Sequence, residues 1–186
     1  MDRRYSTNHI FMAIGACIFL TSPIFLLVIP LIVVSTIYYD RNAWVTYVPS
    51  VNYLIFGIGL FFLILACVLI WLLDVKKLTI SLGIICVFLS GYMFYGASLS
   101  YVTITDEEIV YRKPFSQEKH LYEWDELDKL LYYEKLPEDD GLSYYEFYFK
   151  DKKMLSIKQN GPVASIQSSL SWKARDLDIP YIYVEE

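Results

Sequence analysis

An apolar run of about 30 residues without a charged side chain fills positions 10–39, IFMAIGACIFLTSPIFLLVIPLIVVSTIYY. One helical crossing of a bilayer needs about 20 predominantly apolar residues, whereas the apolar core of a secretory signal peptide has only about 7–15. The run therefore predicts a membrane span. Pro23 and Pro30 should kink this segment. A tilted single crossing and a re-entrant hairpin that leaves on the side it entered both remain open.

Two further apolar runs, 51–73 and 78–98, are separated only by the short polar turn DVKK at 74–77. They predict two antiparallel neighbouring spans, and residues 1–98 become an anchor of about three transmembrane helices. None of the three spans contains an ionisable residue of the kind that pumps, transporters and voltage sensors keep inside the membrane. This pattern favours an anchor or an interaction bundle over transport or intramembrane catalysis.

All three cysteines, Cys17, Cys67 and Cys86, fall in these apolar runs, so we expect them to act as small buried apolar residues. A disulfide framework is excluded, because the polar half of the chain has no cysteine. Lipidation at Cys17 is not expected, since only a few apolar residues precede it.

From residue 99 the pattern changes to strand periodicity. Tyr101, Thr103 and Thr105 alternate with two aliphatic residues, which is the period-2 signal of a strand. Further strands are predicted at 108–112, 120–124, 130–136, 143–150 and 154–158, with turns at 106–107, 113–117 and 137–141. An apolar stripe at three- and four-residue steps then predicts an amphipathic helix at about 162–177. The fold class is α+β: a helical anchor, then a module at 99–186 of about six or seven antiparallel strands, closed by a C-terminal helix.

The order of these elements, with EIVYR, HLYEWDELDKL and EFYFKDKKMLSI before the helix, resembles the bacterial pleckstrin-homology-like (PH/GRAM-type) domains over residues 100–178. Such domains often follow two or more membrane spans in bacterial membrane proteins. The resemblance implies a cytosolic scaffold module in the bacterial plasma membrane. It supplies no catalytic residue and does not by itself imply phosphoinositide binding.

One cluster is a candidate for contact with the membrane surface. If the last span runs directly into the first strand, the turn after the second strand returns toward the lipid. This turn carries the candidate contact residues Arg112, Lys113, Phe115 and Lys119. Each cation close to an anionic leaflet contributes about 1 kcal/mol. The alternative is an ordinary polar hairpin turn.

No constellation for catalysis, a cofactor or a metal is predicted. His9 and His120 lack obvious partners, and the motifs HExxH, CxxC, GxSxG and the P-loop are absent. Glu138, Asp139 and Asp140 lack the ligand spacing of a calcium loop and predict a solvated turn. Trp124 and Trp172 are expected in the core or in helix packing.

The charge distribution also limits the choice of partners. The part after residue 98 carries 18 acidic and 11 basic residues, which argues against a nucleic-acid partner. The expected partners are the lipid bilayer and a protein or a second copy of the chain, with no small-molecule substrate inferred.

Orientation is left open by the charges. With three crossings, Arg3, Arg4, Lys76 and Lys77 on one side oppose Arg41, Arg112, Lys113 and Lys119 on the other. The expected function is a non-enzymatic anchor that presents its module to a protein or to the membrane surface. The alternatives are an immunity or stress-protection protein against a membrane-active peptide toxin, and an accessory subunit of a transporter or secretion complex.

Overall fold

The computed structural model describes residues 7–135 and 141–185. The predicted turn at 137–141, with its three acidic residues, lies outside the described residues except for Gly141, and so do Arg3 and Arg4. The chain forms two compact units. The helical unit contains α1, α2, α3 and the stretch Lys113–Gln117. The β unit contains Tyr38–Pro49, Tyr101–Arg112 and the described residues from Glu118 onward. The units thus divide the chain at several points, whereas the sequence predicted one boundary after residue 98.

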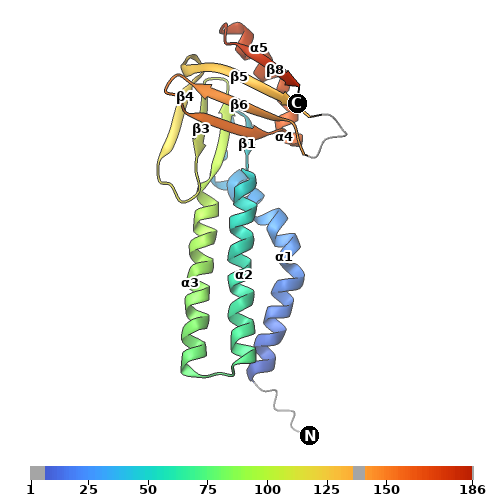
Figure 1. Ribbon diagram of the computed structural model, residues 1–186, viewed down its shortest axis with the longest axis vertical. Coiled ribbons are helices and arrows are strands. Elements are labelled where there is room, and N and C mark those ends of the chain that lie inside the picture. The colour runs from blue at the N-terminus through green and yellow to red at the C-terminus, as the bar shows by residue number, and fades with distance from the viewer. Residues whose placement is uncertain (1–6, 136–140, 186) are drawn as a thin grey trace. The chain divides into compact units, whose positions relative to one another are not determined.

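The helical unit contains the three predicted helices, α1 (Thr7–Ile37), α2 (Ser50–Leu72) and α3 (Lys77–Leu99) (Figure 1). All three are long and apolar enough to cross a membrane, and they indicate a membrane location. The re-entrant alternative for the first run does not hold, because α1 continues through both prolines as one helix of 31 residues.

The helices of this unit pack closely at small residues. Gly59 of α2 lies so near the Phe94 ring of α3 that a Cβ at this position would be 2.5 Å from a ring carbon. Phe94 in turn packs on Phe56, with ring centroids 4.6 Å apart. Close approach at a small residue is the usual way in which membrane helices gain packing energy, since lipid offers no hydrophobic driving force between them.

Polar contacts mark both ends of the helical unit. The Asn8 side chain donates a hydrogen bond to Asp74 in the α2–α3 turn, at 2.6 Å. The fully buried Asn52 side chain near the start of α2 donates to the backbone carbonyl of Ser100, at 2.6 Å. The start of α1 therefore lies beside the α2–α3 turn, and the start of α2 lies beside the end of α3.

The β unit contains two four-stranded sheets. Sheet A has the order β1 (Ala43–Tyr47), β2 (Tyr101–Thr105), β3 (Glu108–Arg112) and β4 (Lys119–Glu123), with all neighbours antiparallel. Sheet B has the order β7 (Met154–Lys158), β6 (Tyr144–Phe149), β5 (Leu127–Glu134) and β8 (Tyr181–Glu185). A short 3-10 turn at Trp124–Glu126 joins β4 to β5.

The β unit departs from the predicted module in three respects. Its described residues form eight strands, two more than the six predicted segments, because β1 comes from the connection between α1 and α2 and β8 follows the helix. The sheets are not purely antiparallel, since β8 pairs with β5 in parallel. The predicted helix at 162–177 is divided at Ile166 into α4 (Gly161–Ser165) and α5 (Gln167–Asp176), and it does not close the unit, because β8 comes after it. A parallel pair needs a crossover connection, and α4 and α5 supply it between β7 and β8.

One continuous core holds the β unit together. Its fully buried members come from both sheets and from the two helices, among them Ile104, Phe147, Ile157 and Leu170. Val45 and Tyr47 of β1 belong to the same core, with about 5–6% of their surface exposed. The connection between α1 and α2 is thus a structural part of the β unit.

The connectivity has a direct consequence for topology. β1 follows the end of α1 after five intervening residues and precedes the start of α2, whereas β2 follows α3 after Ser100 alone. Since β1 and β2 are hydrogen-bonded neighbours, a membrane crossed by the three helices has residues 38–49 and the chain after residue 100 on one side. Asn8 and the turn at Asp74 are then on the other side.

Candidate functional site

The predicted surface-contact residues lie on and beside the β3–β4 connection. Arg112 and Lys119 are directly opposite each other at the ends of β3 and β4. Lys113 and Phe115 lie between them, in the stretch Lys113–Gln117, which we call the basic loop and which belongs to the helical unit. Lys113 is exposed, and 39% of the Phe115 surface is exposed. The structure therefore brings Arg112 and Lys119 together on sheet A, whereas Phe115 belongs to the helical unit.

Phe115 packs on the last two turns of α3. Its ring stacks on Tyr92, with centroids 5.1 Å apart and planes at 27°. The ring also fills the space beside Gly96, where an added Cβ would overlap it. We call this position the Gly96 notch. The 23 residues of α3 give a length of about 34 Å, against a hydrocarbon core of about 30 Å. In a spanning α3, the notch would therefore lie near the level where hydrocarbon meets headgroups.

The backbone at Phe115 is in the left-handed region, with φ at 58°. This conformation costs an L-residue roughly 1–2 kcal/mol, because the Cβ approaches the following carbonyl oxygen. A stacked aromatic pair contributes about 0.5–1.5 kcal/mol beyond its buried area. The strain is thus of the same order as the stacking term alone, and the buried part of the Phe115 ring stabilises this position further.

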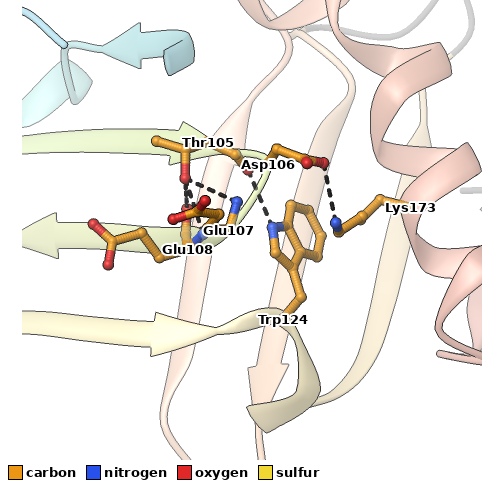
Figure 2. A network of polar contacts seen from close by, with 6 residues as sticks. All are labelled: Thr105, Asp106, Glu107, Glu108, Trp124 and Lys173. Carbon is orange, nitrogen blue, oxygen red and sulfur yellow. Dashed lines mark hydrogen bonds and ion pairs between the residues drawn. The ribbon is translucent and has the colours of Figure 1, made fainter. Parts of the chain in front are cut away.

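A second feature lies at the β2–β3 turn in the β unit (Figure 2). The Thr105 hydroxyl accepts hydrogen bonds from the backbone N–H of Glu107 at 3.2 Å and of Glu108 at 2.9 Å, and it donates to the Glu108 carbonyl at 3.1 Å. The buried Trp124 indole donates to the Thr105 carbonyl at 3.1 Å. The hydroxyl and the carbonyl group of Thr105 are therefore both held by hydrogen bonds, which fixes the turn. Trp124 is 2% exposed, so its expected burial is confirmed.

This turn borders an acidic cleft of about 460 Å³. The cleft is lined by Asp106, Glu107, Glu108, Glu123, Trp124, Asp125, Lys173 and Leu177. Lys173 of α5 forms an ion pair with Asp106, at 3.0 Å (Figure 2). Because five carboxylates face one ammonium group, the cleft has a negative potential that attracts cations. No group of three or more His, Cys, Asp or Glu side chains that could hold a metal ion occurs within the described part of the chain.

A stack of aromatic rings joins the two sheets. Tyr122 of β4 lies on Phe149 of β6, with centroids 3.8 Å apart, and Tyr111 stacks on His120 at 4.7 Å. Tyr122 also donates a hydrogen bond to Asp151, at 2.7 Å. Burial raises the pKa of Tyr111 and of Tyr122 to about 12, and the bond to Asp151 adds to the shift at Tyr122. Both phenols therefore stay protonated at neutral pH, and the stack has a structural role.

The outer face of sheet B carries three tyrosines and one methionine. The strands of sheet B alternate between buried and exposed positions, so one face packs in the core and the other is accessible. The accessible face carries Lys129, Leu131, Tyr133, Tyr144, Glu146, Tyr148, Met154, Ser156, Lys158, Ile182 and Val184. Tyr133 stacks on Tyr144, with centroids 4.5 Å apart, and the Lys129 ammonium lies 4.7 Å from the Tyr148 ring centroid. We call this face the sheet B face, and these two contacts hold four of its side chains.

Some other predicted positions differ from expectation. Trp172 was expected in packing, but 60% of its surface is exposed on α5. Cys17 is exposed and Cys67 half-buried within the helical unit, so only Cys86 has the expected burial. His120 is bracketed by Glu118 at 3.7 Å and by the Lys153 ammonium at 3.4 Å, and it lies in a strand as predicted.

Two structural features were missed from the sequence. The first is β1, AWVTY, in which four of the five residues are β-branched or aromatic and could have indicated a strand. The second is the Gly96 notch, for which no local signal exists, since its partner is 19 residues further along the chain. No protein-family model matches this chain, and no curated protein or solved structure matches it.

Proposed function

We propose that this protein is a non-enzymatic, multi-pass protein of the bacterial plasma membrane that presents a PH-like β unit to a protein partner at the membrane surface. The observation that carries the proposal is the pairing of β1 with β2. Because of this pairing, the β unit is joined to the ends of α1 and α3 and to the start of α2 by short chain segments. Three short connections suit a module held at a membrane better than one carried on a flexible tether.

The PH-like character is supported by the order of elements from β2 to β7 followed by α5. The strands β1 and β8 would then be additions to this plan. Such modules are scaffolds in the bacterial proteins that this chain resembles, which supports a cytosolic β unit. Positive charges do not favour either orientation, because Lys76 and Lys77 would lie on one side of the membrane and Arg41 and Lys113 on the other.

The sheet B face is the surface that best suits a protein partner. Tyrosine and methionine are enriched at protein interfaces, because they offer a large contact area for little lost conformational freedom. The Tyr133–Tyr144 stack and the contact between Lys129 and Tyr148 hold this surface in place before binding. The basic loop is proposed as the contact with lipid, through the exposed Lys113 and the part of Phe115 outside the notch.

In-cell photo-cross-linking of the full-length protein tests the proposal. A photoreactive amino acid replaces Met154, which is 46% exposed on the sheet B face, and in a matched variant it replaces the exposed Ser165 of α4. We expect a discrete protein adduct from position 154 and none from position 165. An adduct with a peptide toxin would instead favour immunity, and an adduct with a larger membrane assembly would favour an accessory subunit. A turnover in the purified protein that is lost on a point substitution in the β unit would overturn the proposal.

A further inference from the structure

The basic loop is distinguished by three observations on the described part of the chain. It is the one stretch after Ser100 that belongs to the helical unit. Its apex residue, Phe115, has a left-handed backbone that a bulky side chain rarely adopts. The Phe115 ring fills the Gly96 notch and still leaves 39% of its surface exposed. A strained residue that fills a notch and is itself only partly buried is a candidate for a conformational switch.

The notch is a matching feature of α3. Gly96 is buried, and no side chain larger than hydrogen fits there while Phe115 is in place. Gly91, five residues earlier on the same helix, has open space around its Cβ direction. Glycine is therefore needed at position 96 to make room for the Phe115 ring, whereas a methyl group at position 91 would meet no neighbour.

We propose that the basic loop is a releasable latch with two states. In the docked state, Phe115 occupies the Gly96 notch and stacks on Tyr92. In the released state, the Phe115 backbone relaxes out of the left-handed region, and the ring enters the lipid interface beside α3. Aromatic side chains favour that level of a bilayer, and Lys113 next to the ring favours anionic headgroups.

The latch links the helix end to sheet A through the chain itself. α3 continues through Ser100 into β2, β2 pairs with β3, and β3 leads into the basic loop, which returns to α3. A change in α3 or in the surrounding lipid that alters the notch would thus release Phe115 from α3, while β3 remains paired with β2. This inference goes beyond the proposed function, because it requires no protein partner.

Spin labelling of the full-length protein in nanodiscs of phosphatidylcholine and phosphatidylglycerol tests the latch. The label is attached at Gln117→Cys, an exposed loop position, after the three native cysteines have been replaced. We expect the wild-type loop to give two spectral components, one immobile and one mobile. Gly96→Ala should shift the population toward the mobile component by about tenfold, since overpacking disfavours the docked state. Gly91→Ala is the matched control and should leave the ratio unchanged.

A second substitution separates the latch from general damage to the fold. Phe115→Ala should also give the mobile component, and adding Gly96→Ala to it should cause no further change, because the ring that the new methyl would strike is gone. In the released state, collisions of the label with membrane-dissolved oxygen should rise relative to collisions with a water-soluble nickel chelate. A single component that neither substitution alters would overturn the proposal, and so would an equal shift in Gly91→Ala. Release into water, with only nickel collisions rising, would overturn the lipid-inserted state.

Discussion

Replacing Val45 with threonine should weaken the whole β unit, although residue 45 lies between two candidate membrane spans. Val45 is 6% exposed, pairs with Ile104 and belongs to the core shared by both sheets. Threonine has nearly the same shape, so Val45→Thr mainly places a hydroxyl group in this core. Burying a hydroxyl without a hydrogen-bond partner costs about 1–3 kcal/mol in proteins. The free energy of unfolding of the β unit should fall by that amount.

Hydrogen exchange of the detergent-solubilised full-length protein measures this change. A loss of about 1–3 kcal/mol makes the amides of β2 and β3 exchange about 5–150 times faster. Thr46→Val is the matched control, because the next residue is half-exposed and its substitution should stay within about 0.5 kcal/mol. Unchanged exchange in Val45→Thr, or equal acceleration in both variants, would refute the assignment of β1 to the core.

Three further outcomes are expected. Gly59→Ala should lower the thermal midpoint of the helical unit by overpacking against α3, at a cost of about 1–3 kcal/mol, whereas Gly57→Ala, with only an ordinary contact at 3.6 Å, should not. Asn52→Asp should destabilise this unit more than Asn52→Leu, as tested by heating in detergent, because it buries an unpaired negative charge beside the Ser100 carbonyl oxygen, whereas leucine removes only the hydrogen bond. Burial holds the pKa of Tyr111 and Tyr122 at about 12, so their stabilisation is complete below pH 10 and is lost as pH rises from about 10 to about 12. Denaturant titrations across this interval should show a smaller loss for Tyr122→Phe than for the wild type.

The sequence predicts an element reliably where its signal is local. The alternation at 101–105 and the charges at 106–107 predict the β2–β3 hairpin, and both strands have the predicted bounds. The three apolar runs likewise predict three helices, since length and hydropathy are properties of each segment alone. Trp124 is buried as expected, because it follows an alternating strand and its indole reaches a backbone carbonyl.

Elements that depend on distant partners were missed for physical reasons. AWVTY at 43–47 has strand propensity, but five residues between two apolar runs become a strand only through pairing with β2, far along the chain. β8 likewise depends on a parallel partner that only the α4–α5 crossover can bring to it. The break at Ile166 interrupts an apolar stripe that continues across it, so periodicity could not reveal two helices.

The candidate site was predictable only in part. The basic loop was found from Lys113, from the flanking Arg112 and Lys119, and from the position of its hairpin after the last span. The Gly96 notch was not, because a glycine in an apolar run does not reveal which side chain will fill the space beside it. The left-handed backbone of Phe115 is equally invisible in the sequence, since the turn chemistry there would favour glycine or asparagine.

The central claim is that the connection between α1 and α2 shares one side of the membrane with the β unit. It is tested most directly by thiol labelling in intact cells, with single cysteines at Asn42, Val75 and Ser156 in a chain without native cysteines. All three positions are exposed. We predict that Asn42→Cys and Ser156→Cys react from the same side and Val75→Cys from the other, with the first two labelled only after lysis if the β unit is cytosolic. Labelling of positions 42 and 156 from opposite sides would contradict it.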